Sequence, residues 1–126
     1  MKLAFLAISV LSVGFLLANL TGCQTDTAGA TNTLGYYSTM VSGPPDKVTT
    51  AAQKAAGDLN LTDIVGNSTK IDGKVTAKNA QGDAVTIDVE QAGDGVSKVT
   101  IHIGVTGDDA VSKQLVDRIK SHLTWL

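Results

Sequence analysis

Apolar and polar residues alternate along three stretches in the second half of the chain. The apolar positions are Val75 and Ala77, then Val85, Ile87 and Val89, then Val99, Ile101, Ile103 and Val105. Alternation places successive side chains on opposite faces of a strand, so each stretch predicts a strand with one buried face. Turns rich in Gly, Asn and Asp at residues 79–83 and 91–95 join them. Short turns of this kind favour hairpins, and the pattern therefore predicts an antiparallel meander.

Two other segments carry apolar residues at the spacing of a helix. They are Val48, Ala52, Ala55 and Leu59 in the first segment, and Val111, Leu115, Ile119 and Leu123 in the second. This periodicity predicts two amphipathic helices. Pro45 suits the first turn of one helix, and Asp108 is expected to cap the start of the other. The core face of the first helix is mostly alanine, so this helix should pack closely against its partner.

Two shorter segments complete the predicted fold. Residues 34–41 have a composition that favours a strand, and residues 61–65 form a short apolar run that Gly66-Asn67-Ser68 is expected to end. The predicted order is β-α-β-β-β-α, or β-α-β-β-β-β-α if residues 61–65 form a separate strand. Both helices should cover one face of the antiparallel sheet, which makes the fold an α+β two-layer sandwich.

The first 23 residues have the pattern of a bacterial lipoprotein signal. Lys2 precedes an apolar stretch that runs to Leu17, somewhat shorter than the roughly 20 apolar residues that a membrane-spanning helix needs. The sequence Leu20-Thr21-Gly22-Cys23 follows. It resembles the lipobox, in which an apolar residue, a small residue and Gly or Ala precede a cysteine. We therefore expect cleavage between Gly22 and Cys23, and acyl chains such as palmitate on Cys23.

Cys23 is the only cysteine in the chain, which excludes an intramolecular disulfide and any site built from several thiolates. Its place in the motif favours lipidation over the alternative, an ordinary secretory signal or an uncleaved anchor. Two or three acyl chains hold a protein stably on a membrane. Gln24 stands where lipoproteins of the inner membrane tend to have Asp, so we expect sorting to the outer membrane, facing the periplasm.

These features divide the 126 residues into three parts. Residues 1–22 are predicted to be the signal peptide, residues 23–33 the lipidated cysteine with a polar, flexible tether, and residues 34–126 one small α+β domain. The formal charge is −2, and it becomes −3 from Cys23 onward because the signal removes only Lys2. An acidic chain does not suit nucleic-acid binding, and no basic run is present to replace lipid as the anchor.

Several segments of the predicted domain share features with a known family. They are residues 46–59, 73–78, 82–87, 99–108 and 111–120. On these segments the chain resembles the small bacterial lipoproteins of domain-of-unknown-function family 3568. The resemblance implies a small lipoprotein and carries no assigned activity.

Candidate functional residues lie on the predicted polar face of the sheet. They are Lys74, Lys78, Asp88, Glu90, Lys98 and His102. His102 would need a partner and a pocket to act as a base, and a half-exposed sheet residue is the simpler interpretation. The sequence contains no Gly-x-Ser-x-Gly elbow, phosphate-binding glycine motif or calcium-loop pattern. We therefore predict no catalytic residue, no cofactor and no metal site.

Two functions remain open from the sequence. The first is a non-enzymatic, lipid-anchored envelope domain that offers a sheet face or edge to a protein or cell-wall partner. The second is a small-molecule-binding domain or minor enzyme that uses a groove between the sheet and the alanine-rich helix, where small side chains would leave a cavity. The absence of a catalytic motif in the sequence favours the first.

Overall fold

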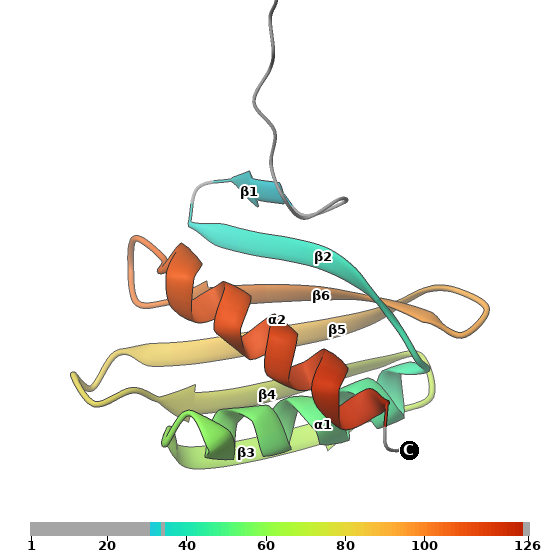
Figure 1. Ribbon diagram of the computed structural model, residues 1–126, viewed down its shortest axis with the longest axis horizontal. Coiled ribbons are helices and arrows are strands. Elements are labelled where there is room, and N and C mark those ends of the chain that lie inside the picture. The colour runs from blue at the N-terminus through green and yellow to red at the C-terminus, as the bar shows by residue number, and fades with distance from the viewer. Residues whose placement is uncertain (1–30, 34, 125–126) are drawn as a thin grey trace, which may run out of the picture.

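A computed structural model describes residues 31–33 and 35–124. An antiparallel sheet forms one layer, and two helices lie side by side across one of its faces (Figure 1). The elements in chain order are β1 (Thr31–Thr33), β2 (Tyr36–Ser42), α1 (Pro45–Asp58), β3 (Thr62–Ser68), β4 (Asp72–Lys78), β5 (Ala84–Gly93), β6 (Val96–Ile103) and α2 (Asp109–Leu123). The predicted α+β two-layer fold is confirmed.

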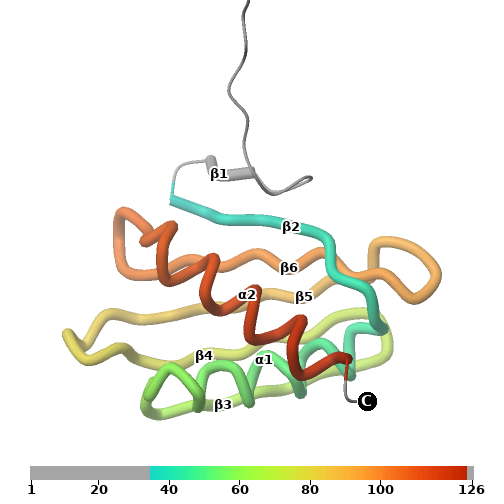
Figure 2. Tube along the Cα trace, in the orientation of Figure 1, coloured from blue at the N-terminus to red at the C-terminus, as the bar shows by residue number. Residues whose placement is uncertain are grey.

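The strands lie in the order β1-β2-β6-β5-β4-β3. β3 to β6 form an antiparallel meander, which confirms the three predicted hairpin strands and makes β3 a separate strand. β2 pairs with β6, although about 60 residues separate them in the chain, and Figure 2 shows the trace of β2 running beside β6. The sheet therefore has β1 at one edge and β3 at the other.

Alternation along the strands gives the sheet an inner face beneath the helices and an open face. The inner face is apolar, and its buried side chains are Tyr37, Val41, Val75, Ala77, Val85, Ile87, Val89, Val99, Ile101 and Ile103. The helices complete the core with Val48, the alanines of α1, Leu115, Val116 and Ile119. Burying one such Val, Leu or Ile side chain contributes about 1.5–3 kcal/mol, so this face is the main source of stability.

Two glycines let α1 approach the sheet. A Cβ added at Gly73 of β4 would overlap the side chain of Thr49, and one added at Gly66 of β3 would overlap that of Gln53. Thr49 is buried, and its hydroxyl donates a hydrogen bond of 2.7 Å to the carbonyl oxygen of Pro45. The close packing predicted from the alanines of α1 is therefore present, and it is directed at β3 and β4.

Several strand ends differ from those predicted, including that of β5, which runs to Gly93 and so into the turn expected at residues 91–95. β3 continues through residues 66–68, because Gly66 fits beneath Gln53 and pairs with Val75 instead of ending the strand. β6 ends at Ile103 because Gly104 turns the chain with φ of 64°, so Val105 is exposed and not a core residue. Residues 31–33, assigned to the tether, form β1 and pair with β2.

The edge strand β3 is irregular. Its register against β4 shifts between Thr62 and Val65, and Asp63 within this bulge has φ of 55°. Only a few per cent of residues other than glycine adopt this left-handed conformation, and Asp is among those that tolerate it. The bulge therefore bends the first half of β3 away from a regular ladder.

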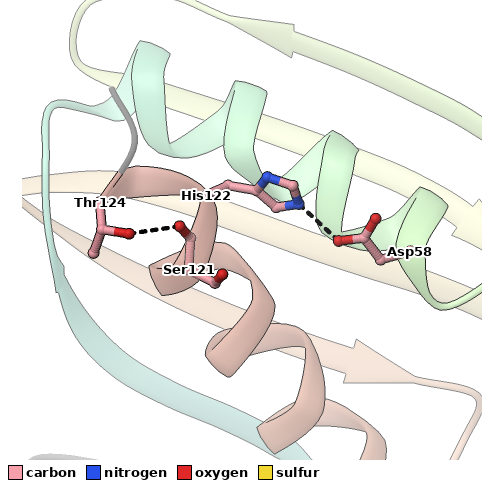
Figure 3. A network of polar contacts seen from close by, with 4 residues as sticks. All are labelled: Asp58, Ser121, His122 and Thr124. Atoms are coloured by element: carbon pink, nitrogen blue, oxygen red, sulfur yellow. Dashed lines mark hydrogen bonds and ion pairs between the residues drawn. The ribbon is translucent and has the colours of Figure 1, made fainter.

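Both helix starts are as predicted, and the helix ends are joined. Asp108 caps α2 by accepting a hydrogen bond of 3.0 Å from the backbone N–H of Val111, and α1 begins at Pro45. Nε2 of His122, near the end of α2, lies 2.7 Å from Oδ2 of Asp58 at the end of α1 (Figure 3). His122 thereby connects the ends of the two helices.

Candidate functional site

All six predicted interaction residues lie on the open face of the sheet. They come from three adjacent strands: Lys74 and Lys78 from β4, Asp88 and Glu90 from β5, and Lys98 and His102 from β6. The cross-strand register arranges them in rows that continue into β2 and β3. The rows decide which of the six residues are neighbours.

The first row contains an ion pair. Lys74 and Asp88 are direct cross-strand partners, and Nζ of Lys74 lies 3.4 Å from Oδ1 of Asp88. Along the same row, the side-chain oxygens of Ser38 and Thr100 share a hydrogen bond of 3.0 Å. Both charged side chains are substantially exposed, so their pairing stabilises the fold by at most about 1 kcal/mol. The ion pair can therefore exchange for contacts with another molecule at small cost.

The second row places two acidic residues opposite each other. Asp72 is the cross-strand partner of Glu90, and Glu90 is in turn the partner of Lys98. Like charges directly opposite one another destabilise a sheet, whereas the neighbouring lysine offsets part of that cost. Asp72 and Glu90 therefore place two carboxylates side by side, where a cationic group of another molecule would be attracted.

The third row ends in two aromatic side chains, His102 of β6 and Tyr36 of β2. The rings of His102 and Tyr36 stack with centroids 4.2 Å apart and planes inclined by 27°. The cross-strand partners of His102 are Tyr36 and Thr86, so no carboxylate lies directly opposite the imidazole in this row. His102 therefore lacks a cross-strand group to orient it as a general base. Lys78, at the end of β4 between Thr62 and Ala84, lies at the margin of the face.

A hollow of about 330 Å³ adjoins the first two rows. Its lining residues are Asn67, Ser68, Thr69, Asp72, Gly73, Lys74, Asp88, Val89 and Glu90. The hydroxyl of Thr69 donates a hydrogen bond of 2.8 Å to Oδ1 of Asp72 and accepts one from the backbone N–H of Ile71, which holds the turn between β3 and β4. The structure thus brings Lys74, Asp88 and Glu90 together beside polar residues of β3.

Sequence reasoning missed the β3 side of this hollow. The predicted strand ended at residue 65. No cross-strand partner was therefore predicted for the residues beyond it that line the hollow, which are Asn67, Ser68, Thr69 and Asp72. In the structure, Asn67 is the cross-strand partner of Lys74. The usable signal was the short segment between residue 65 and the strand that contains Val75 and Ala77, because a short connection favours a hairpin of two neighbouring strands.

Two other hollows lie at the ends and edge of the sheet. One, of about 380 Å³, is lined by Met40, Val41, Ser42, Lys120, Leu123 and Thr124. The other, of about 440 Å³, is lined by Asn79, Gln81, Asp83 and residues 103–108. None of these three hollows has a lining residue from α1. At Gly66 and Gly73 the space between α1 and the sheet is filled by Gln53 and Thr49.

Two kinds of feature are absent from the part of the chain that the structure describes. Within residues 31–33 and 35–124, no three His, Cys, Asp or Glu side chains are grouped so that they could hold a metal ion. No helix in this same part of the chain has the length and apolar character to cross a membrane. Gly22 and Cys23, the predicted cleavage and lipidation residues, lie outside the described residues.

A protein-family comparison matches nearly the whole chain. The family described as protein of unknown function (DUF3568) matches residues 1–122. The match includes both the described domain and the N-terminal segment that carries the lipobox-like sequence, and it confirms the family resemblance seen in the sequence. No curated protein matches the chain.

Proposed function

We propose that this chain, which belongs to the DUF3568 family of proteins of unknown function, is a lipid-anchored cell-envelope protein whose open sheet face binds another protein. The proposed role is non-enzymatic. One observation carries it: the helices cover a single face of the sheet, and the other face presents opposed charges around a hollow of about 330 Å³.

The anchoring part of this proposal is supported by the sequence. The only cysteine in the chain stands at the last position of Leu20-Thr21-Gly22-Cys23, where a diacylglyceryl group is added in lipoproteins. Gln24 favours the outer membrane, with the domain in the periplasm. β1 begins at Thr31, so only a short linker separates the proposed anchor from the sheet.

The binding part is supported by the charges of the open face. Both signs are interspersed, and such patterns steer and select protein partners more than they add affinity. A lysine or arginine of a partner would relieve the repulsion between Asp72 and Glu90. Phosphate-rich or uniformly acidic ligands would instead meet three carboxylates, those of Asp72, Asp88 and Glu90.

Anchoring is tested by the intact mass of the protein purified from membranes. We expect a chain that begins at Cys23 and carries the mass of acyl chains, and we expect Cys23→Ser to remain an unprocessed precursor or to be released after miscleavage. Because Cys23 precedes the described domain, the substitution should leave thermal unfolding unchanged. A wild-type mass with a free thiol, or cleavage elsewhere, would contradict the anchor and the assignment to the outer membrane.

Binding is tested by photo-cross-linking in cells. A photoreactive residue at Asn67, which lines the hollow, should yield a discrete protein adduct, whereas one at Lys113, exposed on α2, should not. Glu90→Lys should abolish the adduct, while Asp117→Lys, a matched charge reversal on α2, should leave it unchanged. Adducts containing only cell-wall fragments, or an adduct insensitive to Glu90→Lys, would overturn the proposal of a protein partner on this face.

A further inference from the structure

The chain enters the described domain at one edge of the sheet. β1 begins at Thr31 and pairs with the first residues of β2, at the edge opposite β3. The eight Cα–Cα steps from Cys23 to Thr31 span at most about 29 Å when fully extended. β3 lies four strand spacings beyond β2, a further distance of about 19 Å. A lipid on Cys23 would therefore attach the domain to the membrane through the β1–β2 side of the sheet, and the properties of the two edges decide which of them meets the lipid.

β1 covers only part of this edge. Within the described residues it pairs with Tyr36–Ser38 and leaves the second half of β2 without a neighbouring strand on that side. There the hollow of about 380 Å³ opens between β2 and the last turn of α2, with Met40, Leu123 and Lys120 in its lining. The side chain of Met40 is 52% exposed. The uncovered edge thus combines a flexible apolar side chain with a cation.

The two edges of the sheet differ in charge. Among the described residues that line the hollow at β2, Lys120 is the only charged one. Lys98 is the cross-strand partner of Met40 on one side and of Glu90 on the other. The hollow beside β3 has one lysine and three carboxylates. Exposed apolar side chains do not distinguish the two edges, because Val65 at the β3 edge is 56% exposed and Met40 at the β2 edge is similarly exposed. The charges do distinguish the two edges, because anionic lipid headgroups attract lysine and repel carboxylates.

Tyr36 lies beside this uncovered edge, in the part of β2 that pairs with β1. It lies on the open face of β2, is 48% exposed, and stacks on His102. Tyrosine is favoured where an apolar ring meets a polar headgroup layer. Methionine adapts to irregular apolar surroundings such as lipid chains. The exposed residues of this edge are therefore of the types found at membrane interfaces.

We infer that the β2 edge rests on the phospholipid surface that holds the anchor. The contact surface, which we term the β2 rim, consists of Tyr36, Met40, Lys98, Lys120 and Leu123. This inference rests on the proposed lipid anchor at Cys23. It orients the domain: the rim faces the bilayer, and the hollow beside β3, with Asn67 and Asp72, faces away and is accessible to a partner protein.

Two matched cysteine variants test this orientation. Met40→Cys and Val65→Cys replace exposed apolar side chains of the open face at opposite edges of the sheet. In the lipidated protein the sulfur of Cys23 is a thioether, so each variant has one free thiol for a nitroxide label. The full-length lipidated protein is placed in phosphatidylethanolamine–phosphatidylglycerol vesicles. Collision rates with oxygen, which concentrates in lipid, and with a water-soluble nickel chelate are then measured.

We expect the oxygen-to-nickel ratio to be severalfold higher at position 40 than at position 65. Lys120→Glu should lower the ratio at position 40 toward that at position 65, because a carboxylate repels the headgroups. Lys54→Glu, an exposed charge reversal on α1, should leave it unchanged.

The intact mass separates failure of the anchor from failure of the rim. An unmodified Cys23 would overturn the anchor, and the rim inference with it. Acylated protein with equal ratios at the two positions would overturn the rim alone. A label at position 40 that is shielded from both oxygen and nickel would also overturn it, because such shielding indicates contact with protein and not with lipid.

Discussion

The two faces of the sheet are built from the same strands but are held in place differently. Ile101 and His102 are neighbours in β6, yet Ile101 is fully buried beneath the helices, whereas His102 stacks on a half-exposed tyrosine ring on the open face. On the inner face every side chain is confined by several others. On the open face the contacts are pairwise and partly solvated. Stability therefore depends mainly on one face, and the other is free to serve recognition.

The largest effect is expected when an acidic residue is introduced on the inner face and compared with the same substitution on the open face. Ile101→Asp places a carboxylate in the centre of the apolar core, and we expect it to destabilise the domain by more than about 4 kcal/mol. His102→Asp, one residue further, should cost less than about 1 kcal/mol. Urea denaturation followed by circular dichroism measures both. Equal losses would show that β6 does not present alternate residues to the two faces.

A smaller effect is expected where α1 approaches the sheet. Gly73→Ala adds a methyl group that overlaps Thr49, and overpacking of this kind costs about 1–3 kcal/mol. Gly57→Ala in α1, where the added carbon meets no neighbour within 4 Å, should instead stabilise the helix by about 0.5–1 kcal/mol. Thermal unfolding compares the two variants. Combining Gly73→Ala with Thr49→Ala should recover part of the loss, and no recovery would argue against this contact.

A further decrease in stability is expected from the start of α2, which lies outside both faces of the sheet. Asp108→Ala removes the side-chain cap of α2 and should destabilise the domain by about 1 kcal/mol, whereas Asp108→Asn should retain most of the stability because it can accept the same hydrogen bond from Val111. Chemical denaturation resolves this difference. If both variants lost the same free energy of unfolding, the cap would contribute through its charge and not through the hydrogen bond.

The smallest effect belongs to the open face. Lys74→Ala removes the ion pair with Asp88, and because both groups are exposed the loss should be within about 0.5 kcal/mol. Thermal unfolding of the variant and of the wild type measures this loss of stability. A loss above 2 kcal/mol would mean that the open face also carries stability, which would remove the distinction between the two faces.

The parts of the fold predicted from the sequence are those that local periodicity encodes. Alternation located β4, β5 and β6 and correctly placed Lys74, Asp88 and Glu90 on one face, and the stripes of α1 and α2 predicted the second layer. The pairing of Lys74 with Asp88 follows once the hairpin register is known. These features depend on residues close together in the chain.

The missed features depend on contacts between distant segments. Gly66 resembles a strand breaker until Gln53 of α1 is known to lie above it, so the end of β3 and the residues beyond it were misplaced. Alternation also continued through Gly104 to Val105, although the glycine turns the chain and ends β6. The polar side of the hollow, including Asn67 and Asp72, appeared only with the full register of β3 against β4.

The bulge in β3 has a consequence for how copies of this protein behave at high concentration. A regular edge strand offers its free backbone groups to the edge of another molecule, and repeated pairing of this kind builds insoluble fibres. The register shift between Thr62 and Val65, with Asp63 in a left-handed conformation, removes the even spacing that such pairing needs. A charged side chain at the irregular point adds repulsion between copies. The irregularity of β3 thus protects this edge of the sheet against pairing with another copy.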